Sequence, residues 1–188
     1  MTRHTNCGVR GEAMSNLKQV GLNLSDFEVE YGAFPDATTR VDVKEVTGTT
    51  LTLGTTSSNQ MFRQLIATGV KSEKIFWAKS ALTPRKPDDV SNSDATALAP
   101  GECAFTYVAG MSSHGDPKAP LAMVPVIPGT WKFDPKPYQG EAFVLTIDGT
   151  LMRHPIDKHG HVMIGGKNLF DPGQPYWRGK TPDIKWPE

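Results

Sequence analysis

The chain has 188 residues, and its 20 Lys and Arg residues balance its 20 Asp and Glu residues. This balance excludes the basic footprint of a nucleic-acid-binding domain and the polybasic segment of a protein that binds membrane surfaces. The length suits one domain with a sizeable core, and no apolar run reaches the roughly 20 residues of a membrane-spanning helix.

An amphipathic helix is predicted near the beginning of the chain, from Ala13 to Tyr31. Six side chains recur at alternating intervals of four and three residues and therefore share one stripe, which needs a sheet or other helices to cover it. The stripe consists of Ala13, Leu17, Val20, Leu24, Phe27 and Tyr31. Gly32 and Pro35 end the helix. Met14, Leu22 and Val29 lie off the stripe and indicate an assembly surface.

The next segments change in character. Residues 41–53, "VDVKEVTGTTLTL", are rich in Val and Thr, which predicts two short strands or an extended excursion. A second helix is predicted over about residues 58–68, because Ser57 and Gln60 have the spacing of a capping box and Gly69 stands where a C-terminal cap is expected. The large side chains of "KIFWA" are expected to be buried in a short strand or turn rather than to form a binding platform.

The middle of the chain alternates between loop and strand signals. Residues 83–102 are polar and rich in Pro, Asp and Ser, which predicts a surface loop. The segment "CAFTYVAG" is typical of a strand. In "PLAMVPVIPG", Pro120, Pro125 and Pro128 each lack a donor for a sheet ladder, so no regular central strand is expected there.

The segment "EAFVLTIDGTLMRH" predicts a β-hairpin with Asp148 and Gly149 as a two-residue type I′ turn. The register that follows pairs Ile147 with Thr150, Leu145 with Met152, and Phe143 with His154. One face, made of Phe143, Leu145, Ile147 and Met152, would then be the bed for the helix stripe. The segment "HVMI" is expected to add a third strand. The tail that follows has little periodicity and is expected to wrap over the surface with Trp177 and Trp186 as anchors.

The two cysteines, Cys7 and Cys103, are too few for a disulfide framework. They form either one long-range disulfide, which would restrict the unfolded chain, or two separate thiols. In the second case Cys103 is a small core residue in a strand.

The densest set of candidate metal ligands lies in "HPIDKHGH". Asp157, His159 and His161 would point to one side of an extended segment, with His154 nearby, and zinc accepts such ligands. The spacing matches no metalloenzyme motif, and Pro155 and Gly160 favour an exposed loop. A calcium site from Asp88, Asp89, Asp94, Asp148 or Asp157 lacks a regular D-x-D-x-D loop. We therefore expect no cofactor.

Other chemistry has equally little support. The chain contains no G-x-S-x-G motif, and the adjacent Ser112, His114 and Asp116 of "SSHGD" favour a loop over a catalytic triad, whose members must meet in space. Four aromatic residues that could stack on a sugar are expected to be core residues and loop anchors instead. They are Trp131, Tyr138, Tyr176 and Trp177. The sequence does not indicate an enzyme.

The opening segment "MSNLKQVGLNLSDFEVEYGAFPD" resembles type IV pilin-like proteins and type II secretion pseudopilins, the bacterial set with a prepilin-type N-terminal cleavage and methylation signal. Two blocks carry the resemblance: Asn16, Leu17, Lys18, Gln19, Gly21, Leu22 and Leu24, and then Tyr31, Phe34 and Pro35. "AFVLTIDGTL" is similar to a late strand and Asp-Gly turn of that family. Together these segments cover about a fifth of the chain and one hairpin.

The resemblance implies a single α+β, pilin-like domain over residues 1–188. Residues 1–35 would provide a long N-terminal helix, and residues 36–188 a head with an antiparallel sheet, loops and an irregular tail. The implied function is that of a non-catalytic filament subunit, with other pilin or pseudopilin subunits and secretion machinery as partners. It would lie on the periplasmic or cell-surface side of the bacterial inner membrane, anchored by an apolar helix half upstream of the present sequence.

Two other functions stay open at this point. One is a secreted or periplasmic glycan-binding module that uses the aromatic residues of the tail. The other is a metal-dependent enzyme centred on His154, Asp157, His159 and His161.

Overall fold

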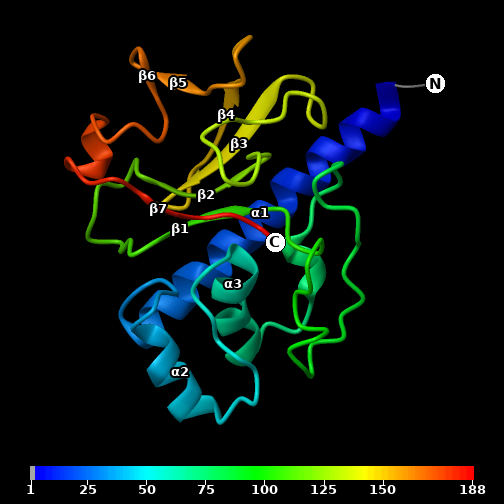
Figure 1. The fold of residues 1–188 in the computed structure, drawn as a ribbon, viewed down its shortest axis with the longest axis vertical. Helices are drawn as coiled ribbons and strands as arrows, with labels where there is room; N and C mark the ends of the chain where they lie inside the picture. The colour runs from blue at the N-terminus through cyan, green and yellow to red at the C-terminus, as the bar shows by residue number, and fades with distance from the viewer. Residues whose placement is uncertain (1–2) are drawn as a thin grey trace.

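A long helix packed on an antiparallel sheet organises the molecule, as the sequence predicts (Figure 1). The computed structural model describes residues 3–188. Its helices are α1 (Arg3–Tyr31), α2 (Thr39–Thr47), α3 (Ser58–Ala67) and the short 3₁₀ segments η1 (Glu73–Phe76) and η2 (Pro175–Trp177). Its strands are β1 (Thr106–Ala109), β2 (Pro120–Val124), β3 (Glu141–Thr146), β4 (Leu151–Pro155), β5 (Met163–Ile164), β6 (Lys167–Asn168) and β7 (Asp183–Lys185). The fold is α+β with a loop-rich C-terminal region.

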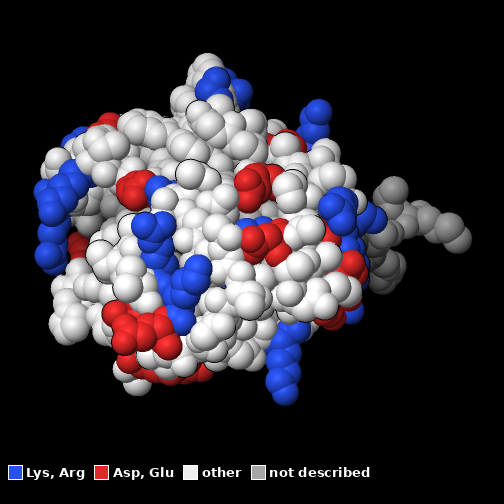
Figure 2. All heavy atoms as spheres, turned by 60° about the horizontal axis from the view of Figure 1, so that its bottom comes forward, with Lys and Arg blue, Asp and Glu red and all other residues white. Residues whose placement is uncertain are grey.

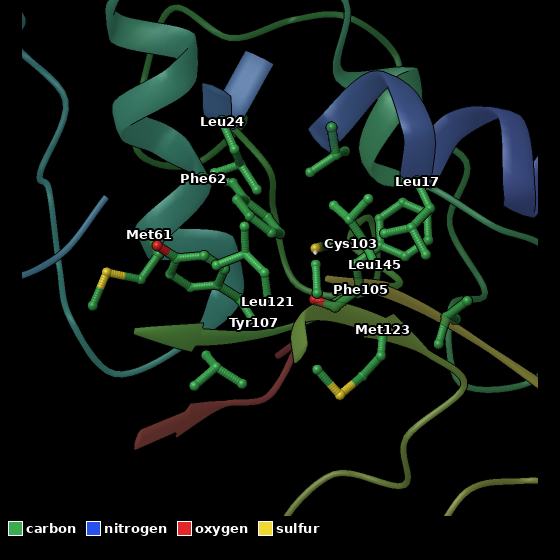
Figure 3. Packing of buried hydrophobic residues seen from close by; sticks show 14 of the residues in the cluster. Leu17, Leu24, Met61, Phe62, Cys103, Phe105, Tyr107, Leu121, Met123 and Leu145 are labelled. Carbon is green, nitrogen blue, oxygen red and sulfur yellow. Dashed lines mark hydrogen bonds between the residues drawn. The ribbon is translucent and has the colours of Figure 1, made fainter. Parts of the chain in front are cut away.

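Helix α1 buries the predicted stripe. Ala13, Leu17, Val20 and Leu24 are fully buried, and Phe27 is almost fully buried. Tyr31 is partly buried and stacks on Phe27, with ring centroids 4.6 Å apart. Figure 3 shows Leu17 and Leu24 directed into the interior, where Phe62 and Tyr107 also lie. Gly32, with a φ of 78°, follows the helix where the sequence predicts its end.

Helix α1 begins ten residues before the predicted start, at Arg3 instead of Ala13. The added residues have no regular apolar spacing, and this is why periodicity did not mark them. Val9 and Met14 are partly buried against the core, so this part of the helix retains some packing. In Figure 1 the N-terminal end of α1 (blue) projects at the upper right of the molecule.

Helix α1 and strand β3 approach each other closely at Gly21. A Cβ atom added to Gly21 would lie 2.8 Å from Cδ2 and 3.0 Å from Cδ1 of Leu145. Glycine has no Cβ, so at this position the helix backbone can approach the Leu145 side chain closely. The face of β3 that carries Leu145 is therefore the bed of α1.

The prediction of strands over residues 41–53 is wrong, because Thr39–Thr47 form α2. The Asp36 carboxylate accepts hydrogen bonds from the N–H groups of Thr38 and Thr39, at 2.7 and 2.9 Å, and so stabilises the beginning of the helix. Val43 is fully buried, and Gly48 ends α2 in the left-handed conformation. Local capping and one buried contact thus outweigh the strand propensity of Val and Thr.

The second predicted helix is confirmed as α3. The Ser57 side chain accepts a hydrogen bond from the Gln60 N–H at 3.2 Å, as expected for the predicted cap. The "KIFWA" segment is confirmed as a buried turn, because η1 leads into Phe76, Trp77 and Ala78, all buried.

The main sheet has the strand order β4-β3-β2-β1-β7, with every pair antiparallel. Its central strand is β2, so a central strand does form in this proline-rich segment. Its pairing with β3 shifts register between Pro120 and Ala122, which agrees with the expectation that the strand is not regular. Pro120 is the first residue of β2 and Pro125 lies just after its end, so the four residues from Leu121 to Val124 are free of proline. Proline is compatible with these positions because the regular ladder does not need its missing N–H there.

The β3–β4 hairpin exists as predicted, but its register differs by one residue. Leu145 pairs with Leu151, and Val144 with Met152. The Ile147 N–H instead donates to the Ala119 carbonyl at 2.9 Å, so Ile147 joins the β2 side and the turn becomes longer. A shift of one residue turns side chains to the opposite face. Met152 therefore lies on the face away from α1 and is 43% exposed, instead of joining the bed of the helix.

The C-terminal region is only partly as predicted. Trp177 is buried and its Nε1 donates to the Leu169 carbonyl, and the partly buried Trp186 donates to the Thr130 carbonyl, so both act as anchors. The "HVMI" segment does not extend the main sheet, because β5 pairs with β6 in a separate two-stranded sheet. The tail also contains β7, which pairs with β1 and was not predicted.

We expect Gly21→Ala to lower the free energy of unfolding by about 1 kcal/mol, because overpacking against Leu145 outweighs the better helix propensity of alanine. Gly11→Ala is the matched control, since an added Cβ there meets nothing within 4 Å. It should raise stability by up to about 1 kcal/mol. Urea unfolding measures both. In a Leu145→Ala background Gly21→Ala should become stabilising, and equal effects at the two glycines would contradict the close approach.

Candidate functional site

The side of α1 opposite the buried stripe is the most distinctive exposed surface of an ordered element. Leu22 is 56% exposed and Val29 is 87% exposed. They are two helical turns apart, on the same side of the helix. Ser15, Lys18 and Ser25 are exposed along the same line, and Gly8 and Gly11 continue it toward the N-terminus. We call these seven residues the outer face of α1.

Polar contacts hold α1 in place along its length. The Arg10 guanidinium donates to the side chains of Gln139 and Glu141 at the beginning of β3. The Asn16 amide donates to the carbonyl oxygens of Lys74 and Trp77, at 3.0 and 2.8 Å. None of these contacts uses the outer face, which is thus presented by a helix whose orientation is fixed.

The structure does not bring the four candidate metal ligands together. The Asp157 carboxylate accepts hydrogen bonds from the backbone N–H groups of His159 and His161, both at 2.8 Å. These bonds, the one from His161 first, lower the pKa of Asp157. The rings of His159 and His161 are 6.4 Å apart, and His154 lies on β4. Within residues 3–188 no group of three or more His, Cys, Asp or Glu side chains is arranged to hold a metal ion.

The acidic residues considered for calcium have structural partners instead. Asp88 accepts a hydrogen bond from the Val90 N–H, Asp89 from the Glu73 N–H, Asp94 from Thr52, and Asp148 from the Thr150 N–H. In the "SSHGD" loop, Ser112 Oγ accepts from the His114 N–H at 3.3 Å, and Asp116 accepts from the Lys118 N–H at 2.9 Å. Asp88, Asp148, Ser112 and Asp116 cap their own turns. Asp89 and Asp94 instead join segments that are distant in sequence, so the roles of all six side chains are structural.

The aromatic candidates for sugar stacking do not form an exposed platform. Tyr138, Tyr176 and Trp177 are buried, whereas Trp131 is 39% exposed and packs near Phe170. They act as the core residues and loop anchors that the sequence predicts. The cysteines are separate thiols, with Cys7 exposed and Cys103 buried. Burial raises the pKa of the Cys103 thiol to about 12, so this group is an inert core residue.

A buried acidic cluster was missed by the sequence analysis. Glu73 is fully buried, and its Oε1 accepts a hydrogen bond from the Leu98 N–H at 2.6 Å. Its Oε2 has no hydrogen-bond partner among the described residues. Glu102, also buried, accepts from the Ala99 N–H at 2.9 Å. The two carboxylates hold a buried stretch of the otherwise exposed loop, residues 97–99. The apolar "ALA" of this stretch was the available sign in the sequence that it is buried.

Burial raises the pKa of Glu73 to about 6, and the hydrogen bond from Leu98 only partly opposes this. Glu102, Asp88 and Asp89 raise it further as like charges. The same loop is also held by Arg63, whose guanidinium donates to the carbonyl oxygens of Ala97 and Asp94, at 2.8 and 2.9 Å. We assign this cluster to stability, since it anchors one loop to α3 and η1.

Charges elsewhere do not point to a particular partner. Figure 2 shows Lys, Arg, Asp and Glu side chains interspersed on one face of the molecule, as the balanced composition suggests. None of the helices within residues 3–188 combines the length and the hydropathy needed to cross a bilayer. Searches of protein-family models, curated proteins and solved structures find no match to the chain.

The free energy of unfolding should depend on pH through Glu73. The pKa of its carboxyl is about 6 in the folded protein, against a reference value of 4.5. The folded state therefore binds this proton more tightly than the unfolded state does. The stabilisation that protonated Glu73 provides is fully present below pH 4.5 and is lost as pH rises through about 6. The loss is on the order of 1 to 2 kcal/mol.

Glu73→Gln removes this titration. Urea unfolding measures the free energy of unfolding of both proteins at each pH. Between pH 4.5 and 6 we expect the wild-type protein to lose about 1 to 2 kcal/mol relative to the variant. A difference that stays constant over this range would show that Glu73 does not titrate there.

Proposed function

We propose that this protein is a structural, non-catalytic subunit of a type II secretion pseudopilus or a type IV pilus-like filament. The observation that carries the proposal is the two-sided α1. One side is buried in the domain's own core, while the opposite side exposes Leu22 and Val29 on a helix of 29 residues. Such a helix can pack against its own sheet and against neighbouring subunits at the same time.

Apart from Lys18, the outer face has the composition of a helix-packing surface. Gly8, Gly11, Ser15 and Ser25 are small, and an added Cβ at either glycine would meet nothing within 4 Å. Small residues allow two helices to approach closely, and exposed Leu22 and Val29 gain free energy when a neighbouring helix covers them. The sequence resemblance of residues 14–36 to pilin-like proteins adds independent support.

The proposal includes an anchor and a location. A longer natural chain would carry an apolar helix half before residue 1, continuous with α1, in the bacterial inner membrane. The domain would then lie on the periplasmic or cell-surface side, with other pilin or pseudopilin subunits and the secretion machinery as partners. The natural reading frame tests this directly. A leader followed by about 20 apolar residues is expected, and a start codon without such a segment contradicts the proposal.

Cysteine cross-linking tests the outer face in the full natural chain. In a Cys7→Ser background, which removes the exposed thiol, we expect Leu22→Cys and Val29→Cys to give a ladder of covalent oligomers after mild oxidation in cells. The matched control is Val46→Cys on α2, because Val46 is 68% exposed but lies outside the outer face. Non-reducing electrophoresis followed by immunoblotting measures the ladder.

The control should stay monomeric. Equal ladders from all three positions would indicate random collision, and the absence of a ladder from both α1 positions would refute packing through this face.

A further inference from the structure

A groove of about 870 Å³ lies over β4, on the face of the sheet opposite α1. Leu145 contacts α1, and its neighbour Val144 therefore points to the other face together with its cross-strand partner Met152. Met152 and His154 lie along one side of the groove. The segment around Ile164 and the segment from Gly173 to Tyr176 form the other side. We call this the β4 groove.

The β4 groove has the features of a small-molecule site. Its volume is within the roughly 300 to 1,000 Å³ of ligand pockets. Met152, Ile164, Pro175 and Tyr176 provide an apolar lining, and the rest of the wall consists of polar and charged side chains and two glycines. Met152 is 43% exposed and Ile164 is partly exposed, so apolar surface is left for a ligand to cover. Burial lowers the pKa of His154 and so favours its neutral imidazole, which lies at the groove wall.

The groove carries two acids and two lysines, so its formal charge is balanced and the partners of each group decide which ligand charge fits. Its two acids, Asp116 and Asp148, each use a carboxylate oxygen to cap their own turn, through the N–H groups of Lys118 and Thr150. Its two cations are less engaged. Within residues 3–188 neither the Lys118 nor the Lys167 ammonium forms an ion pair. The Lys167 ammonium donates to the Gly173 carbonyl at 3.1 Å and has further N–H groups available.

We propose that the β4 groove binds a small amphipathic anion, in which an apolar chain or ring carries one carboxylate. The apolar part covers Met152 and Ile164, and the carboxylate is bound by the Lys118 and Lys167 ammonium groups. This inference does not depend on filament assembly, because no residue of the groove belongs to the outer face of α1.

Fluorescence of 1-anilinonaphthalene-8-sulfonate, an aromatic amphipathic anion, provides the binding measurement. We expect a saturable enhancement that decanoate reverses and that decylammonium reverses at least about tenfold less effectively, because only decanoate matches the charge of the lysines. Met152→Glu should weaken probe binding at least about tenfold by placing a carboxylate on the apolar wall.

Matched variants separate the groove from the rest of the surface. Met163→Glu is the control for Met152, since Met163 is 45% exposed on β5 and does not line the groove. Its binding should equal that of the wild-type protein. Lys118→Ala combined with Lys167→Ala should weaken decanoate about tenfold and leave decan-1-ol unchanged, whereas Lys136→Ala combined with Lys158→Ala should change neither.

Circular dichroism and urea unfolding establish that each variant is folded. Wild-type binding by folded Met152→Glu, or equal competition by decanoate and decylammonium, would overturn the proposal.

Discussion

The burial of the α1 stripe against the sheet is the contact on which the other features depend. Leu17, Val20 and Leu24 are fully removed from water, and full burial of such side chains contributes about 1.5 to 3 kcal/mol each. Gly21 lets the helix backbone approach Leu145 on β3 closely. Once this face is fixed, the opposite side of α1 must remain outside the domain, and the second face of the sheet must be covered by some other part of the chain.

That second face is covered by elements that lack strong local signals. Aromatic contacts tie the C-terminal loops together, such as the stacking of Phe133 on Phe170 with centroids 5.9 Å apart. Met123 extends to the side of the strands opposite Leu17 and Leu24 (Figure 3). The coverage is incomplete over the edge strand β4, where Met152 and His154 are left partly exposed. The β4 groove forms because the C-terminal loops do not fully cover the edge strand β4.

The sequence predicts the parts of the fold in which one physical signal dominates. The stripe of α1 and the Ser57 cap of α3 are local patterns, and both are confirmed. Helix α2 depends on the Asp36 cap and the burial of Val43, which outweigh the strand propensity of its residues. The hairpin register depends on a contact with a segment that is distant in sequence. The Ile147 N–H donates to the Ala119 carbonyl instead of pairing with Thr150 across a two-residue turn. Local propensity does not distinguish these two pairings. The apolar letters at 97–99 hint at a buried stretch, but they do not point to Glu73, because this partner of Leu98 lies 25 residues away.

The two proposed surfaces are compatible because the sheet separates them. The outer face of α1 points away from the sheet on one side, and the β4 groove opens on the opposite face of the same sheet. Copies that pack through α1 would bury Leu22 and Val29 near a filament axis and leave the groove on the outside. A subunit of this kind can therefore combine an assembly contact with a ligand site whose residues take no part in assembly, so that substitutions such as Met152→Glu and Leu22→Cys report on separate properties.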